Sequence, residues 1–172
     1  MSAGTRSGDT FPGYWLMIKV RRAEEKDIPD IDRLLNQVNM VHHEIRPDLF
    51  NVGRKYTDDE LHAMIKDDSC PIFAAVDEND KLVGYCMTCF EQMIGDTIRT
   101  DVKTLYIDDL CVDENIRGKH IGATLYEHVK RYAKENGFYN ITLHVWEGND
   151  NAAAFYEKMG LNPQFTCLEA II

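Results

Sequence analysis

LCVDENIRGKHIGA, at residues 110–123, is the stretch that decides the fold. It begins as an apolar, strand-like run, passes through a short turn that contains Arg and Gly, and continues into a helix. The apolar stripe of that helix consists of Ile121, Leu125, Val129, Tyr132 and Ala133. A strand that enters an amphipathic helix in this way predicts an α/β domain.

The turn has the composition of an anion-binding site. The first turn of a helix leaves backbone N–H groups free, and the helix dipole favours negative charge there. Gly118 and Gly122 carry no side chain that would keep a phosphate off the backbone, and Arg117 and Lys119 add positive charge. Many strand–helix turns contain a glycine and a basic residue, so these features alone fit either an ordinary turn or a diphosphate cradle.

A second segment, NDNAAAFYEKMGL at residues 149–161, follows one strand later. Together the two segments resemble the Gcn5-related N-acetyltransferase family. The first is similar to its acetyl-CoA motif Gln/Arg-x-x-Gly-x-Gly/Ala, with Arg117 at the first position, Gly122 at the last, and His120 where the family usually has Gly. The second is similar to Asn-x-x-Ala-x-x-x-Tyr-x-x-x-Gly-Phe, with Leu161 in place of Phe. His120 suits that position only if the backbone there is helical, because a glycine-like φ would exclude His.

The resemblance implies a single-domain mixed sheet, flanked by helices, that splays between the strand ending at Val112 and the strand ending near Trp146. The implied co-substrate is acetyl-CoA, with no metal. Its pantetheine arm would lie in the gap and pair with the backbone of Leu110 and Val112, to either side of Cys111. The implied pyrophosphate ligands are the backbone amides of Arg117, Gly118, Lys119, His120, Ile121 and Gly122. Asn149 would bond to the pantetheine chain.

Acetyl transfer to an amine needs a proton acceptor for the ammonium and a proton donor for the departing thiolate. The resemblance assigns the donor role to Tyr156; the alternative is that Tyr156 only packs beside Phe155 and Met159.

For the proton acceptor we expect Asp108, either as general base or as an anchor for the amine. Residues two apart in a strand share a face, so Tyr106, Asp108, Leu110 and Val112 are predicted to project together, and Asp109 to project oppositely in a structural role. Glu91 is a second candidate for the base. The pair His42 and His43 could bind the acceptor or relay a proton, or could be ordinary loop histidines.

The rest of the chain predicts one domain, residues 17–172, after an N-terminal stretch, residues 1–16, that is a native extension or an expression remnant. Residues 39–55 break the helical pattern and predict a loop or a bent second helical piece. The predicted strands are 17–22, 72–76, 82–90, 102–112, 140–146 and 164–171, and the predicted helices begin near Asp27, Thr57, Ile121 and Asp150.

The composition of the chain argues against some classes of function. The formal net charge of −10 argues against general nucleic-acid binding, and it suits either solubility or a cationic acceptor. No apolar run has membrane-spanning length. The five cysteines are expected as reduced thiols of a cytoplasmic protein, because Cys86 and Cys89 have no zinc partners and point to opposite faces of a strand.

The sequence therefore favours an N-acetyltransferase that moves an acetyl group from acetyl-CoA to a primary amine, and the resemblance leaves a homodimer open. The alternative is a silent acyl-CoA-binding sensor with the same fold. A nucleotide-phosphate enzyme is disfavoured, because neither Gly-x-x-x-x-Gly-Lys-Ser/Thr nor Gly-x-Gly-x-x-Gly occurs in a matching context.

Overall fold

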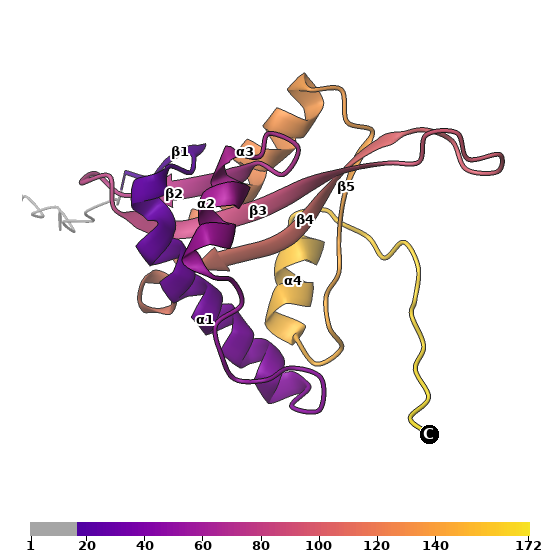
Figure 1. Cartoon of the computed structure of the whole chain (residues 1–172), viewed down its shortest axis with the longest axis horizontal. Helices are drawn as coiled ribbons and strands as arrows, with labels where there is room; N and C mark the ends of the chain where they lie inside the picture. The colour runs from indigo at the N-terminus through magenta and orange to yellow at the C-terminus, as the bar shows by residue number, and fades with distance from the viewer. Residues whose placement is uncertain (1–16) are drawn as a thin grey trace, which may run out of the picture.

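The structure is a computed structural model that describes residues 17–172. The prediction for residues 1–16 lies outside these residues. Five strands form one sheet in the order β1-β2-β3-β4-β5, with antiparallel neighbours throughout except for the parallel pair β4–β5 (Figure 1). The strands are β1 (Lys19–Arg22), β2 (Ile72–Val76), β3 (Leu82–Gln92), β4 (Lys103–Val112) and β5 (Asn140–Leu143). The α-helices are α1 (Ile28–Ile45), α2 (Asp58–Lys66), α3 (Ile121–Glu135) and α4 (Asp150–Lys158).

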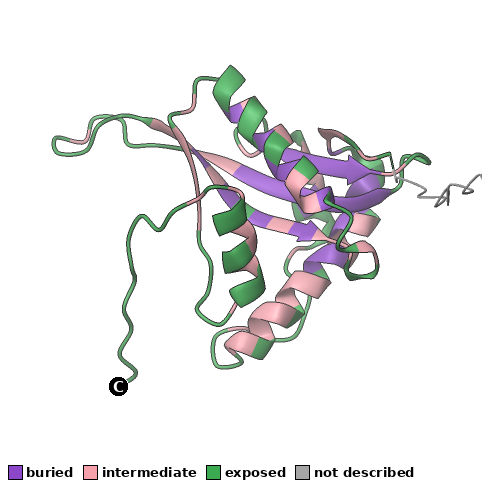
Figure 2. Cartoon of the chain, turned by 180° about the vertical axis from the view of Figure 1, so that it is seen from behind, coloured by how far each residue is buried: buried purple, intermediate pink, exposed green. Residues whose placement is uncertain are grey.

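Two apolar clusters sandwich the sheet. Helices α1 and α2 cover one face, and α3 covers the other together with Phe155 and Met159 of the α4 segment. Successive residues of β2 alternate between the faces, as the period of a strand requires: Ile72 and Ala74 pack toward α1, whereas Phe73 and Ala75 pack toward α3. Figure 2 shows that the purple, buried part of the chain follows the central strands. The predicted mixed α/β fold is confirmed.

A β-bulge interrupts the alternation of β4. Asp109 lies opposite Met87 of β3 and Ile107 lies opposite Thr88, so Asp108 has no partner of its own on β3. Before the bulge Ile107 packs toward α3; after it Leu110 packs toward α3 and Cys111 toward α1. The prediction that Tyr106, Asp108, Leu110 and Val112 share one face is therefore wrong, because the extra residue at position 108 exchanges the two faces of the strand.

The sheet splays between β4 and β5. Pairing runs from Thr104 opposite Asn140 to Ile107 opposite Leu143, whereas β4 continues to Val112. Within the described chain, no strand pairs with this last part of β4 on the side of β5. The predicted splay is thus present, with its apex at Ile107 and Leu143.

Two element boundaries differ from the prediction by three residues or more, and one predicted strand is absent from the described chain. Helix α1 continues to Ile45, because Val41 and Ile45 extend its apolar stripe and Pro47 ends it. Strand β5 stops at Leu143, where the chain leaves β4. The predicted last strand, residues 164–171, has no regular structure. Its apolar residues Phe165, Leu168 and Ile171 recur every three positions and are exposed, so they form no apolar face of period two.

Local end signals are confirmed where neighbours along the chain provide them. Thr57 and Glu60 form the predicted capping box of α2, with Glu60 N–H donating to Thr57 Oγ1 at 3.3 Å. Gly137 ends α3 with φ of 71°. In residues 17–172, no helix combines the length and the hydropathy that crossing a membrane requires.

Candidate active site

The turn between β4 and α3 presents a run of free backbone donors. In the part of the chain that the structure describes, the N–H groups of residues 117–123 make no hydrogen bond within the protein. Asp113 fixes the start of the turn: its side chain accepts from Asn115 N–H at 3.1 Å and pairs with Arg33 of α1 at 2.6 Å. Free N–H groups at the start of a helix favour an anion; that these groups bind a pyrophosphate stays a prediction.

His120 does not meet the condition under which a His suits this position. It has φ of 59° and ψ of 14°, which is left-handed rather than helical. This is the conformation for which the family's Gly is suited. Gly118 is also left-handed, with φ of 83°. Gly122 has a different reason for being small, because a Cβ there would lie 3.4 Å from the Phe155 ring and 3.6 Å from Val112 Cγ2.

Replacing His120 by Gly is expected to raise the free energy of unfolding by about 0.5–1 kcal/mol, because relief of the left-handed strain exceeds the added freedom of the unfolded chain. Urea unfolding measures the difference. Lys119→Gly is the matched control, since Lys119 does not have a positive φ and should gain nothing. A His120→Gly protein no more stable than the parent contradicts the strain argument.

The last residues of β4 offer backbone groups to the splay. Asp113 N–H donates to Val83 O on β3 at 3.0 Å, so alternation turns the groups of Val112 and Leu110 away from β3. Arg117 Nε donates to Val112 O at 3.3 Å and holds the basic side chain against this strand end. Asn149 begins α4, and its side-chain oxygen accepts from Ala152 N–H at 3.2 Å. Its amide NH₂ is not used in that cap.

Two carboxylates and one lysine lie near the apex of the splay. Asp109 is buried and accepts a hydrogen bond from the buried Tyr85 hydroxyl at 3.0 Å. Lys55 Nζ lies 3.3 Å from an Asp108 oxygen and 3.9 Å from an Asp109 oxygen. Both carboxylates therefore reach one ammonium, and the prediction that Asp109 projects away from Asp108 is wrong for the same reason, the bulge.

The charges of this cluster are mutually adjusted. Burial raises the pKa of Asp109 to about 6, although Lys55 and the Tyr85 hydroxyl oppose the shift. Burial lowers the pKa of Lys55, but the two aspartates outweigh it and leave that pKa raised. Burial and the charge of Lys55 lower the pKa of His42. Asp109 is thus a carboxylate whose proton affinity lies near neutrality.

Tyr156 lies on α4, the helix that follows β5 in the chain. Its ring packs on Phe155, with centroids 5.0 Å apart, and approaches Tyr126 of α3 at 6.5 Å. Burial raises the pKa of its hydroxyl, and the charges of Cys86 and Asp109 add to the effect. The hydroxyl therefore stays protonated at neutral pH. The ring contact with Phe155 fits the packing alternative, and the proton-donor role of the hydroxyl stays a prediction.

Helix α1 and the segment after it form a wall over the splay. The Phe50 ring meets His42 at 5.0 Å and Trp146 at 5.3 Å, and a Cβ on Gly148 would lie 3.5 Å from Ile45. His43 is engaged locally, its Nδ1 lying 2.6 Å from Phe50 O. His42 packs on Phe50, and the charges of Lys55 and Asp108 act on its pKa, whereas His43 is bonded to the segment after α1.

Other candidates lie further from the cluster. Glu91 is opposite Thr104, beyond Tyr106 and toward the other end of β4. Tyr106 Oη lies 3.2 Å from His144 Nδ1. Lys55, Tyr85 and Asp109 were not predicted as site residues; only the spacing of the two adjacent aspartates hinted at one of them.

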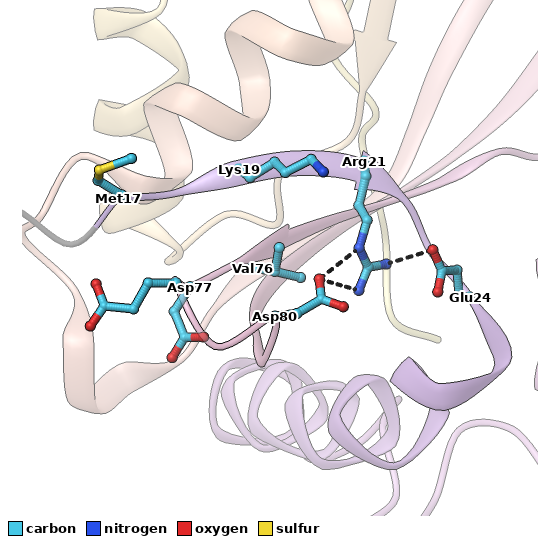
Figure 3. Close-up of a pocket in the computed structure, with 8 residues that line it drawn as sticks. Met17, Lys19, Arg21, Glu24, Val76, Asp77 and Asp80 are labelled. Atoms are coloured by element: carbon cyan, nitrogen blue, oxygen red, sulfur yellow. Dashed lines mark hydrogen bonds and ion pairs between the residues drawn. The ribbon is translucent and has the colours of Figure 1, made fainter.

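A hollow at the opposite edge of the sheet is separate from this site. It is lined by residues of β1 and of the β2–β3 turn, where Arg21 pairs with Asp80 at 3.1 Å and with Glu24 at 3.9 Å (Figure 3). Because β1 and β5 are the two edges of the sheet, this hollow takes no part in the arrangement around the splay.

A splayed sheet, a free-amide turn and a carboxylate near the apex define an acyl-CoA-dependent acyltransferase type of fold. The chain matches the model of the Acetyltransferase (GNAT) family over residues 38–161. It therefore belongs to that family and is an acetyltransferase.

Individual relatives agree with this assignment. The peptidyl-lysine N-acetyltransferase YjaB of Salmonella typhimurium is 27% identical over 147 residues, which is 84% of this chain and 83% of that protein. A mutant of the BH1408 protein from Bacillus halodurans is 30% identical with a TM-score of 0.86, covering 90% of this chain and 99% of that one. The aminoglycoside acetyltransferase meta-AAC0020 from an uncultured soil metagenomic sample, in complex with sisomicin, is 22% identical with a TM-score of 0.67, covering 90% and 96%, and supports the fold alone.

Proposed function

We propose that the protein transfers an acetyl group from acetyl-CoA to a primary amine by direct attack within a ternary complex. The main support for the proposal is the splay between β4 and β5 after Ile107. The free backbone donors of residues 117–122 follow the far end of β4, and the cluster of Asp108, Asp109 and Lys55 lies near the apex of the splay. Residues 117–122 would hold the pyrophosphate, the backbone of Leu110 and Val112 the pantetheine, and the free amide of Asn149 would add a further bond.

Asp109 is proposed as the proton acceptor for the acceptor ammonium. Its carboxylate lies near the apex, and its pKa of about 6 leaves it mostly ionised at neutral pH while bringing its proton affinity closer to that of an effective base. Asp108, the base expected from the sequence, is the nearer partner of Lys55. We therefore assign Asp108 the role of orienting Lys55 and the acceptor; substitution of each aspartate separates the two roles.

Tyr156 is proposed as the proton donor to the departing thiolate. A hydroxyl with a raised pKa remains protonated and can donate when the sulfur acquires charge. The ammonium first loses one proton, which passes through Asp109 to solvent. The neutral nitrogen then forms the new C–N bond, the C–S bond breaks, and Tyr156 protonates the departing sulfur. The second proton that the nitrogen loses as the amide forms restores the Tyr156 hydroxyl.

We propose that the acceptor is a primary amine, which arrives as a cation and reacts in its uncharged form. The net charge of −10 attracts such molecules. The YjaB relatives are named for peptidyl-lysine, and two structural neighbours are named for aminoglycosides. Both classes carry primary amines, so we extend the proposal to either a lysine side chain or a cationic small molecule.

The test is release of free thiol from acetyl-CoA with polyamines, aminoglycosides, amino acids and lysine peptides. We expect release that depends on an amine and saturates with one class. The control is the same panel without protein, and the acetylated product is identified by mass. Calorimetric binding of acetyl-CoA without thiol release by any amine would contradict transfer to this range of amines, and absence of binding would contradict the cradle.

A further inference from the structure

Two cysteines outside the proposed chemistry face each other across neighbouring strand segments. The pairing of β2 with β3 places Ile72 opposite Met87. It continues past the start of β2, since Thr88 N–H donates to Pro71 O at 3.2 Å and Phe90 N–H to Ser69 O at 2.9 Å. This register places Cys70 directly opposite Cys89.

The pair occupies the closer of the two kinds of cross-strand position. The bonds on either side make residues 71 and 88, and residues 69 and 90, the hydrogen-bonded pairs, so Cys70 and Cys89 form a non-hydrogen-bonded pair. Such pairs have Cα atoms about 4.5 Å apart, within the roughly 4.4–6.8 Å that a disulfide spans. Burial, and after it the neighbouring Cys70 thiol, raise the pKa of Cys89.

Exposure separates these two thiols from the other strand cysteines. Cys70 and Cys89 are partly exposed, whereas Cys86 and Cys111 are buried. Cys86 belongs to the cluster under α3, on the opposite face from Cys89, so the C-x-x-C spacing does not bring those two thiols together. Small oxidants can therefore reach the Cys70–Cys89 pair while the neighbouring thiol is shielded.

We propose that Cys70 and Cys89 are an oxidisable dithiol, a modification site at which a peroxide converts two thiols into an intramolecular disulfide. The proposal rests on register and exposure, and it does not depend on the proposed acetyl transfer.

The reaction balances with hydrogen peroxide as the oxidant. The Cys70 thiolate attacks one peroxide oxygen, the O–O bond breaks, and the departing hydroxide takes a proton to become water. The Cys89 sulfur then attacks the sulfenic sulfur of Cys70, an S–S bond forms, and a second water leaves. Two thiols lose two electrons and two protons to the peroxide. Cys70 is assigned the first attack, because burial and contact with Cys70 raise the pKa of Cys89 to about 12.

The pair adjoins the acceptor side of the proposed site. Cys89 lies opposite Tyr106 on β4, and Tyr106 contacts His144. The charge of Asp108 reaches the Cys89 thiol. A bridge would tie the connection between α2 and β2 to the strand beside Tyr106, so oxidation is expected to affect the acceptor side before the cradle at residues 117–122.

The experiment treats the reduced full-length chain with graded hydrogen peroxide, followed by thiol alkylation and mass spectrometry without reduction. We expect the monomer to become lighter by two hydrogens and to yield a peptide that links Cys70 to the segment with Cys89. No Lys or Arg separates Cys86 from Cys89, so Cys89→Ser assigns the bridge. Cys70→Ser and Cys89→Ser should each abolish it, whereas Cys167→Ser, which removes an exposed thiol, should retain it.

Thermal melts of the reduced variants confirm that each one folds. Restoration of both thiols by dithiothreitol is expected. The proposal is overturned if peroxide leaves Cys70 and Cys89 as thiols while Cys167 is oxidised. It is equally overturned if Cys70 accumulates sulfinic acid without any link to Cys89, or if the bridge persists in folded Cys89→Ser.

Discussion

Tyr156→Phe is expected to lower the rate of acetyl transfer by about 10²–10⁴-fold, the usual contribution of a positioned proton donor. The Phe ring preserves the contacts with Phe155 and Tyr126, so the fold and the Kd of acetyl-CoA should change little. Only the hydroxyl, whose pKa is raised by burial, is lost. Steady-state kinetics with the acceptor found by thiol release give kcat, and calorimetry gives the affinity.

Tyr126→Phe provides the matched control. Tyr126 is a buried neighbour on α3, and its replacement removes an equivalent hydroxyl outside the proposed chemistry. Its kcat should stay close to that of the parent. Equal loss in the two variants would show a packing effect, and an undiminished kcat in Tyr156→Phe would remove that residue from the proton-donor role.

Asp109→Asn is expected to cost about 10²–10⁴-fold in kcat/KM. In the parent protein activity should fall below a pH of about 6, where Asp109 takes up its proton. The variant should lack that limb of the pH profile, because Asn does not titrate. Asp108→Asn should retain the limb and change mainly the KM of the acceptor, since Asp108 pairs with Lys55. The reverse pattern would return the base role to Asp108.

The same substitution is expected to stabilise the protein at neutral pH. The pKa of Asp109 is about 6 in the folded chain against an ordinary value of 3.8. The folded state therefore binds more protons between about pH 4 and 6, and stability falls across that window as pH rises. Above it the buried charge costs at most ~3 kcal/mol. Asn removes this cost and can still accept a hydrogen bond from the Tyr85 hydroxyl.

Urea unfolding at pH 7.5 and at pH 4 measures the effect. The gain of Asp109→Asn over the parent should be largest at pH 7.5 and small at pH 4. Asp108→Asn, whose carboxylate is exposed and paired with Lys55, serves as the comparison without such a gain. An Asp109→Asn protein less stable than the parent at pH 7.5 would show that its charge is compensated in the fold.

The turn at residues 117–122, with its free N–H groups, was predictable because its features are local. Free N–H groups at the start of a helix, Gly118 and the basic Arg117 are all contained in one short segment. The conformation of His120 was not predictable from its residue type, because His favours neither conformation strongly enough. Its left-handed φ comes from the path of the turn between β4 and α3.

The acceptor side was predicted less well, because it depends on pairing between distant segments. The bulge at Asp108 is defined by how β4 pairs with β3, and no feature of residues 106–112 predicts it. Lys55 reaches the aspartates from a segment 53 positions earlier. The predicted last strand failed for a related reason, since a strand requires a partner ladder as well as suitable residues.

The α/β class, the start of α2, the end of α3 and the family of the chain all follow from the sequence alone. They rest on caps, apolar periodicity and two motifs, all set by residues near one another along the chain. The approach of Asp109 to Lys55 and the position of Cys70 opposite Cys89 depend on the folded chain. The unpaired residue at position 108 exchanges the two faces of β4, and the register of β2 against β3 places residue 70 opposite residue 89; neither can be read from one strand alone.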